Sequence, residues 1–223
     1  MILKPETTGG CGLTPELITS ILPLAQRQLL ARLEPVEWLT PFYLAGGTAL
    51  ALQLGHRQSA DFDFFSEKEF DSRLLAGRLL QLGRLKRLNE AAGTLHCELA
   101  GVKLSFFYYP HPAWQCIASG KLRIASILDI ALMKLEAISG RGDKKDFIDL
   151  YFILRHITLP ELLQKHQEKY GIDWSNRYHL LRSLSYFADA DDQPMPLMLM
   201  DATWERVKET ISRSVLELDP GEA

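Results

Sequence analysis

The sequence lacks the features that mark exported, disulfide-bonded and membrane-spanning proteins. Its three cysteines, Cys11, Cys97 and Cys116, are an odd number without a C-x-x-C spacing, so neither a disulfide framework nor a structural zinc site is indicated. No segment approaches about 18 uninterrupted apolar residues, and no apolar run follows a basic start. We therefore expect no membrane span and no signal peptide, and a reducing cytoplasm is the expected location.

A strong charge of either sign is also missing. The chain has 25 Lys and Arg against 28 Asp and Glu, a net charge of −3. Residues 1–118 carry 11 basic and 11 acidic side chains, residues 119–157 carry 7 and 5, and residues 158–223 carry 7 and 12. This distribution does not support a basic nucleic-acid-binding domain, so any polynucleotide contact must be local, for example around Arg78, Arg84, Lys86 and Arg87.

The 223 residues, 47% of them hydrophobic, are enough for one large or two small domains. The first half mixes strand and helix patterns, and we predict an α/β sheet domain over residues 1–118. Its expected helices cover about 15–32, 49–54 and 72–82, and its expected strands 42–45, 61–65, 85–88, 94–99 and 102–109.

The second half, residues 119–223, is expected to be a helical domain packed against the first. The sequence predicts helix N-caps at Ser126, Asp143 and Thr158, because each is followed three residues later by an acid. The expected helices lie near 127–139, 144–157, 159–169, 176–188 and 202–215. The predicted fold class is thus mixed α+β, a sheet followed by helices.

Gly46-Gly47-Thr48 follows the strand expected at 42–45, and Thr48 suits the N-cap of a short helix that ends at Gly55. An ordinary strand-to-helix turn explains these residues. The functional alternative is that backbone N–H groups at the helix start, with the Thr48 hydroxyl, bind a phosphate that only glycine lets come close. Alone, the motif is a weak signal.

Asp61-Phe62-Asp63 alternates acid and aromatic, so as a strand it buries its phenylalanine and presents both carboxylates on one face. Two solvated acids on an outer sheet face are the plain alternative. However, Asp is depleted in strands and like charges on one face repel each other, which favours a positive ligand. Hard oxygen ligands on a strand suit Mg²⁺ with nucleotide phosphates.

The two motifs are stronger together, because the 12 residues between Thr48 and Asp61 allow one short helix and a return to the neighbouring strand. The order G-G-[S/T], helix, D-x-D resembles the signature of the polymerase-β-like nucleotidyltransferases. Over about residues 20–210 the chain resembles, in more detail, the AbiEii/AbiGii toxin family. The resemblance is carried by residues 46–50, 56–65, 129–134, 141–151 and 186–190.

This resemblance implies a polymerase-β-like sheet domain and a Mg²⁺-dependent nucleotidyltransferase-like toxin of an abortive-infection or toxin–antitoxin system. The implied reaction transfers a nucleoside monophosphate from an NTP to an acceptor, which in some relatives is tRNA, and a cognate antitoxin is an implied partner. The competing hypothesis is a protein of the same fold that binds nucleotide or antitoxin without transfer activity.

The resemblance also assigns site residues. Gly46, Gly47 and Thr48 would hold phosphate, while Asp61 and Asp63 would hold the metal and act in catalysis. Lys134 would reach triphosphate oxygens or the metal carboxylates, with a snorkelling lysine as the plain alternative. Asp146 and Asp149 would supply a site acid that contacts base, ribose or the catalytic lysine, with a helix cap and a surface ion pair as the alternatives. Arg57, in the loop beside the expected phosphate site, is an anion contact or an ordinary solvated arginine.

One departure from the superfamily concerns a third carboxylate, which commonly lies on a later strand. In the strand expected at 102–109 the polar positions are Lys103 and Ser105, and no acid stands there. Glu98 could substitute from the adjoining strand, but the helical half, through Asp146 or Asp149, is the source we favour.

Overall fold

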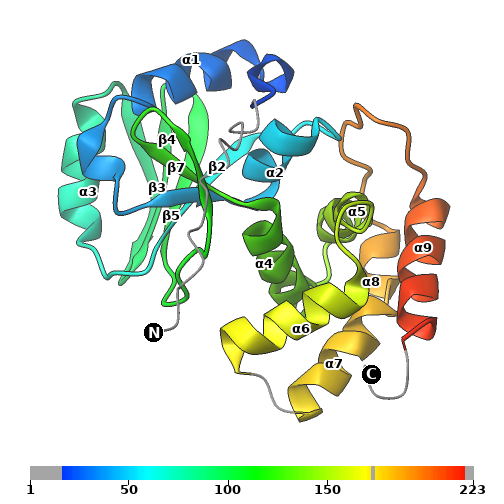
Figure 1. Ribbon diagram of the computed structural model, residues 1–223. Coiled ribbons are helices and arrows are strands. Elements are labelled where there is room, and N and C mark those ends of the chain that lie inside the picture. The colour runs from blue at the N-terminus through cyan, green and yellow to red at the C-terminus, as the bar shows by residue number, and fades with distance from the viewer. Residues whose placement is uncertain (1–16, 172–173, 219–223) are drawn as a thin grey trace, which may run out of the picture.

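A computed structural model describes residues 17–171 and 174–218, which form a sheet half and a helical half (Figure 1). The described residues build a seven-stranded mixed sheet in the order β3-β4-β5-β2-β1-β7-β6. The β1–β7 and β2–β5 pairs are parallel, and the other neighbours are antiparallel. The strands are β1 (Tyr43–Ala45), β2 (Asp61–Ser66), β3 (Leu85–Ala91), β4 (Thr94–Leu99), β5 (Val102–Tyr108), β6 (Cys116–Ser119) and β7 (Leu122–Ala125).

The central strands bury one face and leave the other partly open. In β2, Phe62 and Phe64 are fully buried while Asp61, Asp63 and Phe65 are half-buried, as the period-2 pattern predicts. Helices α1 (Leu24–Leu33) and α3 (Ser72–Leu80) pack against the sheet, contacting β5 and the β3–β4 pair. Neither helix covers the other face of β2 and β5, which borders a cleft on the side of the helical half.

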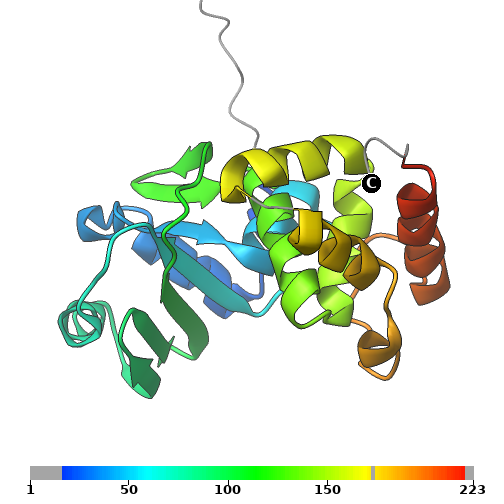
Figure 2. The same ribbon diagram turned by 90° about the horizontal axis from the view of Figure 1, so that it is seen from below.

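The helical half lies beside the sheet, and two views agree on this placement (Figures 1 and 2). Helix α2 (Gly46–Leu54), from the sheet half, contacts both α4 and α5, which joins the two halves through buried side chains. Ser126 caps α4 and Thr158 forms a capping box with Glu161, as predicted. The helices are α4 (Ile127–Gly140), α5 (Lys144–Ile153), α6 (Leu159–Tyr170), α7 (Trp174–Leu184), α8 (Ala188–Asp191) and α9 (Trp204–Leu216).

Three expectations from the sequence need correction. The helix expected at 15–32 begins only after Pro23, as α1, and its first residues lie outside the described part of the chain. The boundary expected at residue 118 falls inside the β6–β7 hairpin, whose strand β7 pairs with β1, so the sheet continues to Ala125. Helix α2 begins at Gly46, which places Thr48 inside the helix and not at its N-cap.

A segment near the C-terminus returns to the sheet half. The backbone N–H of Gln58 donates to the carbonyl of Leu197 at 2.8 Å, and that of Leu199 donates to the carbonyl of His56 at 2.9 Å. Arg57 and Met198 form an antiparallel bridge between these contacts. The chain from 197 to 200 therefore supports the loop that leads into β2.

Across residues 17–171 and 174–218, no helix is both long and apolar enough to cross a membrane.

Gly120 lies in the turn of the β6–β7 hairpin, against the backbone of Glu34. Substituting it therefore tests how closely the hairpin packs on the segment that contains Glu34. The φ of Gly120 is +61°, and a Cβ there would lie 2.7 Å from the carbonyl oxygen of Glu34. Gly120→Ala should lower the free energy of unfolding by more than about 1–2 kcal/mol, the cost of the left-handed backbone alone. Gly77→Ala, in α3 with open space around it, is the control and should be neutral or stabilising. Equal stability of both variants in urea unfolding would contradict this close packing.

Candidate active site

A cleft of about 470 Å³ lies between the open sheet face and helices α4 and α5. Its sheet side includes the loop before α2, the loop before β2, and the open faces of β2 and β5. Its helical side is the face of α4 and the first turn of α5. The lining residues are Gly46, Gly47, Arg57, Gln58, Ser59, Ala60, Asp61, Asp63, Phe65, Phe107, Tyr109, Ile130, Met133, Lys134, Glu136, Ala137, Arg141, Lys145 and Asp146.

Asp61 and Asp63 lie on the same face of β2 and both line this cleft, as predicted from their spacing. Burial raises the pKa of Asp63 above its ordinary value, and the nearby charge of Asp61 raises it further. The two carboxylates thus repel each other in a partly dehydrated position. A cation between them would remove this repulsion, so the pair fits a divalent metal.

Gly46 is required beside this pair. Its φ is +69°, and a Cβ on it would lie 2.8 Å from Oδ2 of Asp63. A side chain would therefore be strained in its backbone and would displace the carboxylate. The glycine keeps the start of α2 in contact with Asp63, so that its backbone N–H groups and the carboxylate border the same cleft.

Gly47 and Thr48 make contacts within the chain that the sequence did not predict. A Cβ on Gly47 would collide with the guanidinium of Arg57, so this glycine makes room for an arginine. Thr48 is fully buried, and its hydroxyl donates to the carbonyl oxygen of Asp61 at 2.5 Å. The prediction that this hydroxyl binds phosphate is wrong, because the group is turned away from the cleft and anchors the first residue of β2.

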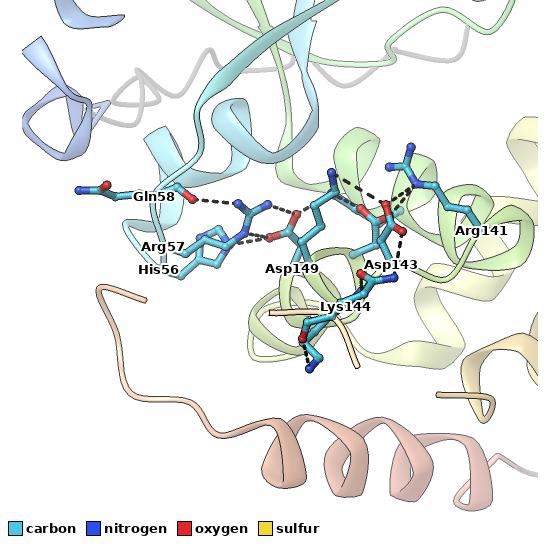
Figure 3. Close-up of polar contacts among 11 residues, drawn as sticks. His56, Arg57, Gln58, Arg141, Asp143, Lys144 and Asp149 are labelled. Atoms are coloured by element: carbon cyan, nitrogen blue, oxygen red, sulfur yellow. Dashed lines mark hydrogen bonds and ion pairs between the residues drawn. The ribbon is translucent and has the colours of Figure 1, made fainter. Parts of the chain in front are cut away.

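Asp149 on α5 joins the two halves of the molecule (Figure 3). Its carboxylate accepts two hydrogen bonds from Arg57, at 2.6 and 2.8 Å, and lies 2.8 Å from Nε2 of His56. Nζ of Lys134 lies 2.5 Å away. Burial alone would raise the pKa of Asp149, but Lys134 and Arg57 outweigh it and hold that pKa far below its usual range.

Arg57 and Lys134 are consequently held by carboxylates. Arg57 also donates to the carbonyl of Gln58 at 2.9 Å, and it lines the cleft although nearly all of it is buried. Burial opposes the charge of Lys134, but Asp149 and Asp146 prevail and raise its pKa above the ordinary value. The snorkelling alternative for Lys134 is wrong, because its ammonium lies within a buried ion network.

Asp146 lies between the network and the cleft. It accepts from Nζ of Lys134 at 2.7 Å and from Nε of Arg141 at 3.1 Å, and it lines the cleft. Asp149 lies deeper and is fully buried. Both carboxylates are thus paired with cations in this structure, Asp146 at the cleft and Asp149 behind it.

No acid lies beside Asp63 on the neighbouring strand β5, where polymerase-β-like nucleotidyltransferases commonly have a third carboxylate. Within the described residues, no three His, Cys, Asp or Glu side chains gather as a metal site. In the sheet register Lys103 of β5 lies between Asp61 of β2 and Glu98 of β4. Glu98 is therefore two strands away from Asp61, and it lies outside the cleft lining. The place beside Asp63 on the parallel strand β5 belongs to Ser105, whose hydroxyl donates to Asp63.

Several cleft residues were not predicted from the sequence. Arg141 and Lys145 bring positive charge to the helical wall, and their side chains are 58% and 53% exposed. Glu136, on α4, accepts a hydrogen bond at 2.7 Å from His166 of α6. Arg141 and Lys145 lie in the family-like segment 141–151, and this was the only indication in the sequence that they could belong to the site. For the aromatic residues of the cleft, the sequence offered only the alternating pattern of a strand.

Comparison with solved structures supports the class of fold. MenT4, the nucleotidyltransferase toxin Rv2826c of Mycobacterium tuberculosis, aligns with a TM-score of 0.54 at 15% identity, covering 86% of this chain and 84% of that one. JHP933 of Helicobacter pylori aligns with a TM-score of 0.51 at 19% identity, covering 87% of this chain and 92% of that one. The fold is that of the nucleotidyltransferases.

Sequence comparison gives the family. The model described as "Nucleotidyl transferase AbiEii toxin, Type IV TA system" matches residues 28–107, which include both glycine and aspartate motifs. An uncharacterized protein of Aquifex aeolicus is 40% identical over 200 residues, covering 86% of this chain and 95% of that protein. The chain belongs to the AbiEii nucleotidyltransferase toxin family, and it is a nucleotidyltransferase of a toxin–antitoxin system.

The network around Asp149 predicts a pH-dependent loss of stability. Asp149→Asn should lower the free energy of unfolding by about 3–5 kcal/mol at neutral pH, because Arg57 and Lys134 would lose a buried carboxylate. The folded-state pKa of Asp149 is depressed, so its contribution is complete above the unfolded value of about 3.9 and is lost as pH falls toward the folded value.

Urea unfolding of wild type and Asp149→Asn should therefore differ by a constant amount above about pH 7, where His56, whose pKa burial lowers, is neutral in the folded and unfolded chains. The difference should shrink below about pH 4, where the Asp149 contribution itself is lost. Asp201→Asn is the control, since the Asp201 side chain is 85% exposed in its pair with Arg206 and should contribute less than about 1 kcal/mol. A gap between wild type and Asp149→Asn that keeps widening below about pH 4 would contradict this assignment.

Proposed function

We propose that this enzyme transfers a nucleoside monophosphate from an NTP to an acceptor in a Mg²⁺-dependent reaction, with pyrophosphate leaving. The observation that carries the proposal is the placement of Asp61 and Asp63 together in the cleft, against the start of α2 at Gly46. Two carboxylates beside a helix N-terminus suit a metal ion bound with nucleotide phosphates.

The proposed roles follow from position in the cleft. Asp61 and Asp63 would hold the metal, which when bound supplies Lewis-acid stabilisation of charge on the transferred phosphoryl group. The backbone N–H groups at Gly46 and Gly47 and the cations Arg141 and Lys145 border the same space and would hold the triphosphate.

Lys134 meets the acids of the helical half, one of the contacts expected for them. Its ammonium is already paired with Asp146 and Asp149, so we assign it to positioning α4 against α5. It also lowers the pKa of Asp63 against the larger effect of burial, which helps to keep that carboxylate ionised. Arg57 likewise positions the loop before β2 instead of contacting an anion directly.

The finer identity of substrates and partners is part of the same proposal. The toxin family supports a cognate antitoxin as partner, and the NTP is the proposed nucleotidyl donor. We take tRNA as the first acceptor to test, in keeping with a cytoplasmic site of action. Incubating the protein with each labelled NTP, Mg²⁺ and total RNA tests the proposal: label transferred to RNA supports it, and NTP binding without transfer would contradict it.

Asp63→Asn should reduce nucleotide transfer by about a hundredfold or more, because a lost metal ligand costs several kcal/mol in the transition state. The thermal midpoint should stay level or rise, since the variant removes a charge that burial and Asp61 destabilise. Glu98→Gln is the matched control and should retain activity, because Glu98 lies on β4, outside the cleft lining. Full activity of Asp63→Asn would refute the metal assignment.

Two acids supply few ligands for a cation that prefers six oxygens, so wild-type protein should bind Mg²⁺ weakly alone and more tightly with an NTP. Ser105→Asp would place a carboxylate next to Asp63 and should tighten Mg²⁺ binding without nucleotide by about tenfold or more. Ser105→Asn, equal in shape but uncharged, should not. Calorimetric titration measures all three proteins, and tight nucleotide-independent Mg²⁺ binding by wild type would contradict the two-acid site.

A further inference from the structure

Three aromatic side chains line the end of the cleft beyond the metal-site acids. Phe65 lies on β2, two residues after Asp63 and therefore on the same face, about 6.6 Å further along the strand. Phe107 pairs with Phe65 from β5, and Tyr109 follows β5 directly. The cleft thus changes from charged to aromatic along the direction of β2.

The aromatic rings support one another. Phe65 and Phe107 are stacked, with centroids 5.2 Å apart and planes 29° apart. Tyr109 meets the edge of Phe65 at 5.7 Å, and its hydroxyl is hydrogen-bonded to that of Tyr170 on α6 at 2.8 Å. These contacts fix the rings before any ligand binds, which reduces the ordering cost of binding.

This aromatic group lies at the edge of the hydrophobic core, where Phe65 stacks on the buried ring of Tyr43 at 5.9 Å. Phe62, Phe64 and Phe106 fill that core and are fully buried on the opposite face. Phe65 and Phe107 are only partly buried and face a cleft that also contains carboxylates. Aromatic surface left in contact with water costs free energy, so its concentration at one end of a ligand cleft points to an apolar ligand group.

The facing wall carries three apolar side chains and one acid, Glu136, whose carboxylate is hydrogen-bonded to His166. Helix α4 contributes Ile130, Met133 and Ala137 to the cleft, while the cations Arg141 and Lys145 come from the end of α4 and the start of α5. A ligand that matches both regions has a charged part that binds metal and cations and a flat apolar part that stacks on rings.

We propose that Phe107 and Tyr109, with Met133 on the facing helix, form a stacking site for a nucleobase, and that Phe65, stacked between Phe107 and Tyr43, supports their rings. The proposal rests on the proposed function, since it assumes that phosphates bind at Asp61 and Asp63. The base belongs either to the NTP or to the terminal nucleotide of the acceptor. Stacking of one base on aromatic side chains strengthens binding by about 5- to 150-fold.

Phe107→Leu tests the site because it keeps apolar volume and removes the ring face. Binding of each of the four NTPs, and separately of inorganic tripolyphosphate, is measured by calorimetry with Mg²⁺, and the KM for total tRNA is measured by label transfer. We expect Phe107→Leu to weaken NTP binding, or to raise the KM for tRNA, by about 5- to 150-fold, with tripolyphosphate binding unchanged. Phe107→Trp should retain wild-type values.

Tyr178→Leu is the matched control, since Tyr178 is 70% exposed on α7 and lies outside the cleft lining. A loss confined to NTP binding assigns the base to the incoming nucleotide, and a loss confined to the tRNA KM assigns it to the acceptor. Unchanged NTP binding and tRNA KM, or an equal loss of NTP and tripolyphosphate binding, would overturn the stacking site alone. If wild-type protein bound neither NTP nor tripolyphosphate with Mg²⁺, the proposed function itself would fail, and the stacking site with it.

Discussion

The ion network centred on the buried carboxylate of Asp149 is the interaction on which the rest of the site depends. It binds Arg57 from the sheet half and Lys134 from the helical half, so the walls of the cleft are fixed relative to each other. Arg57 in turn occupies the space that Gly47 leaves open at the start of α2. Buried ion pairs contribute little net stability but strongly penalise any arrangement that separates them, so this network acts as a geometric constraint more than as a source of stability.

The cleft combines features that are unfavourable for an isolated protein. Asp61 and Asp63 repel each other beside the left-handed Gly46, and aromatic rings face the solvent a few residues away. Each feature becomes favourable when a ligand supplies the matching group, because a cation removes the repulsion and an apolar ring covers the aromatic surface. The fully buried aromatic core on the other face of the same strands, including Phe62, Phe64 and Phe106, supplies the rigidity that lets these groups persist without a ligand.

Much of the fold followed from short-range patterns. The acid–aromatic alternation at 61–65 set the faces of β2 correctly, and Ser126 and Thr158 marked two helix starts. The β6–β7 hairpin was missed because two four-residue strands around Gly120 carry too little periodicity to detect. Long-range pairing was the main limit: Arg57 and Asp149 are 92 residues apart, so an arginine expected to meet an anionic ligand instead meets a carboxylate of the chain itself.

The contact between residues 197–200 and the loop at 56–58 also constrains when the site can exist during synthesis. Chains emerge from the ribosome N-terminus first, and the strands that carry Asp61 and Asp63 emerge before the helical half. The loop that leads into β2 acquires Asp149 and then the backbone of Leu197 and Leu199 only after most of the chain has been translated. A nascent chain therefore lacks the finished cleft until residues 197–200 have been translated and can reach the loop at 56–58.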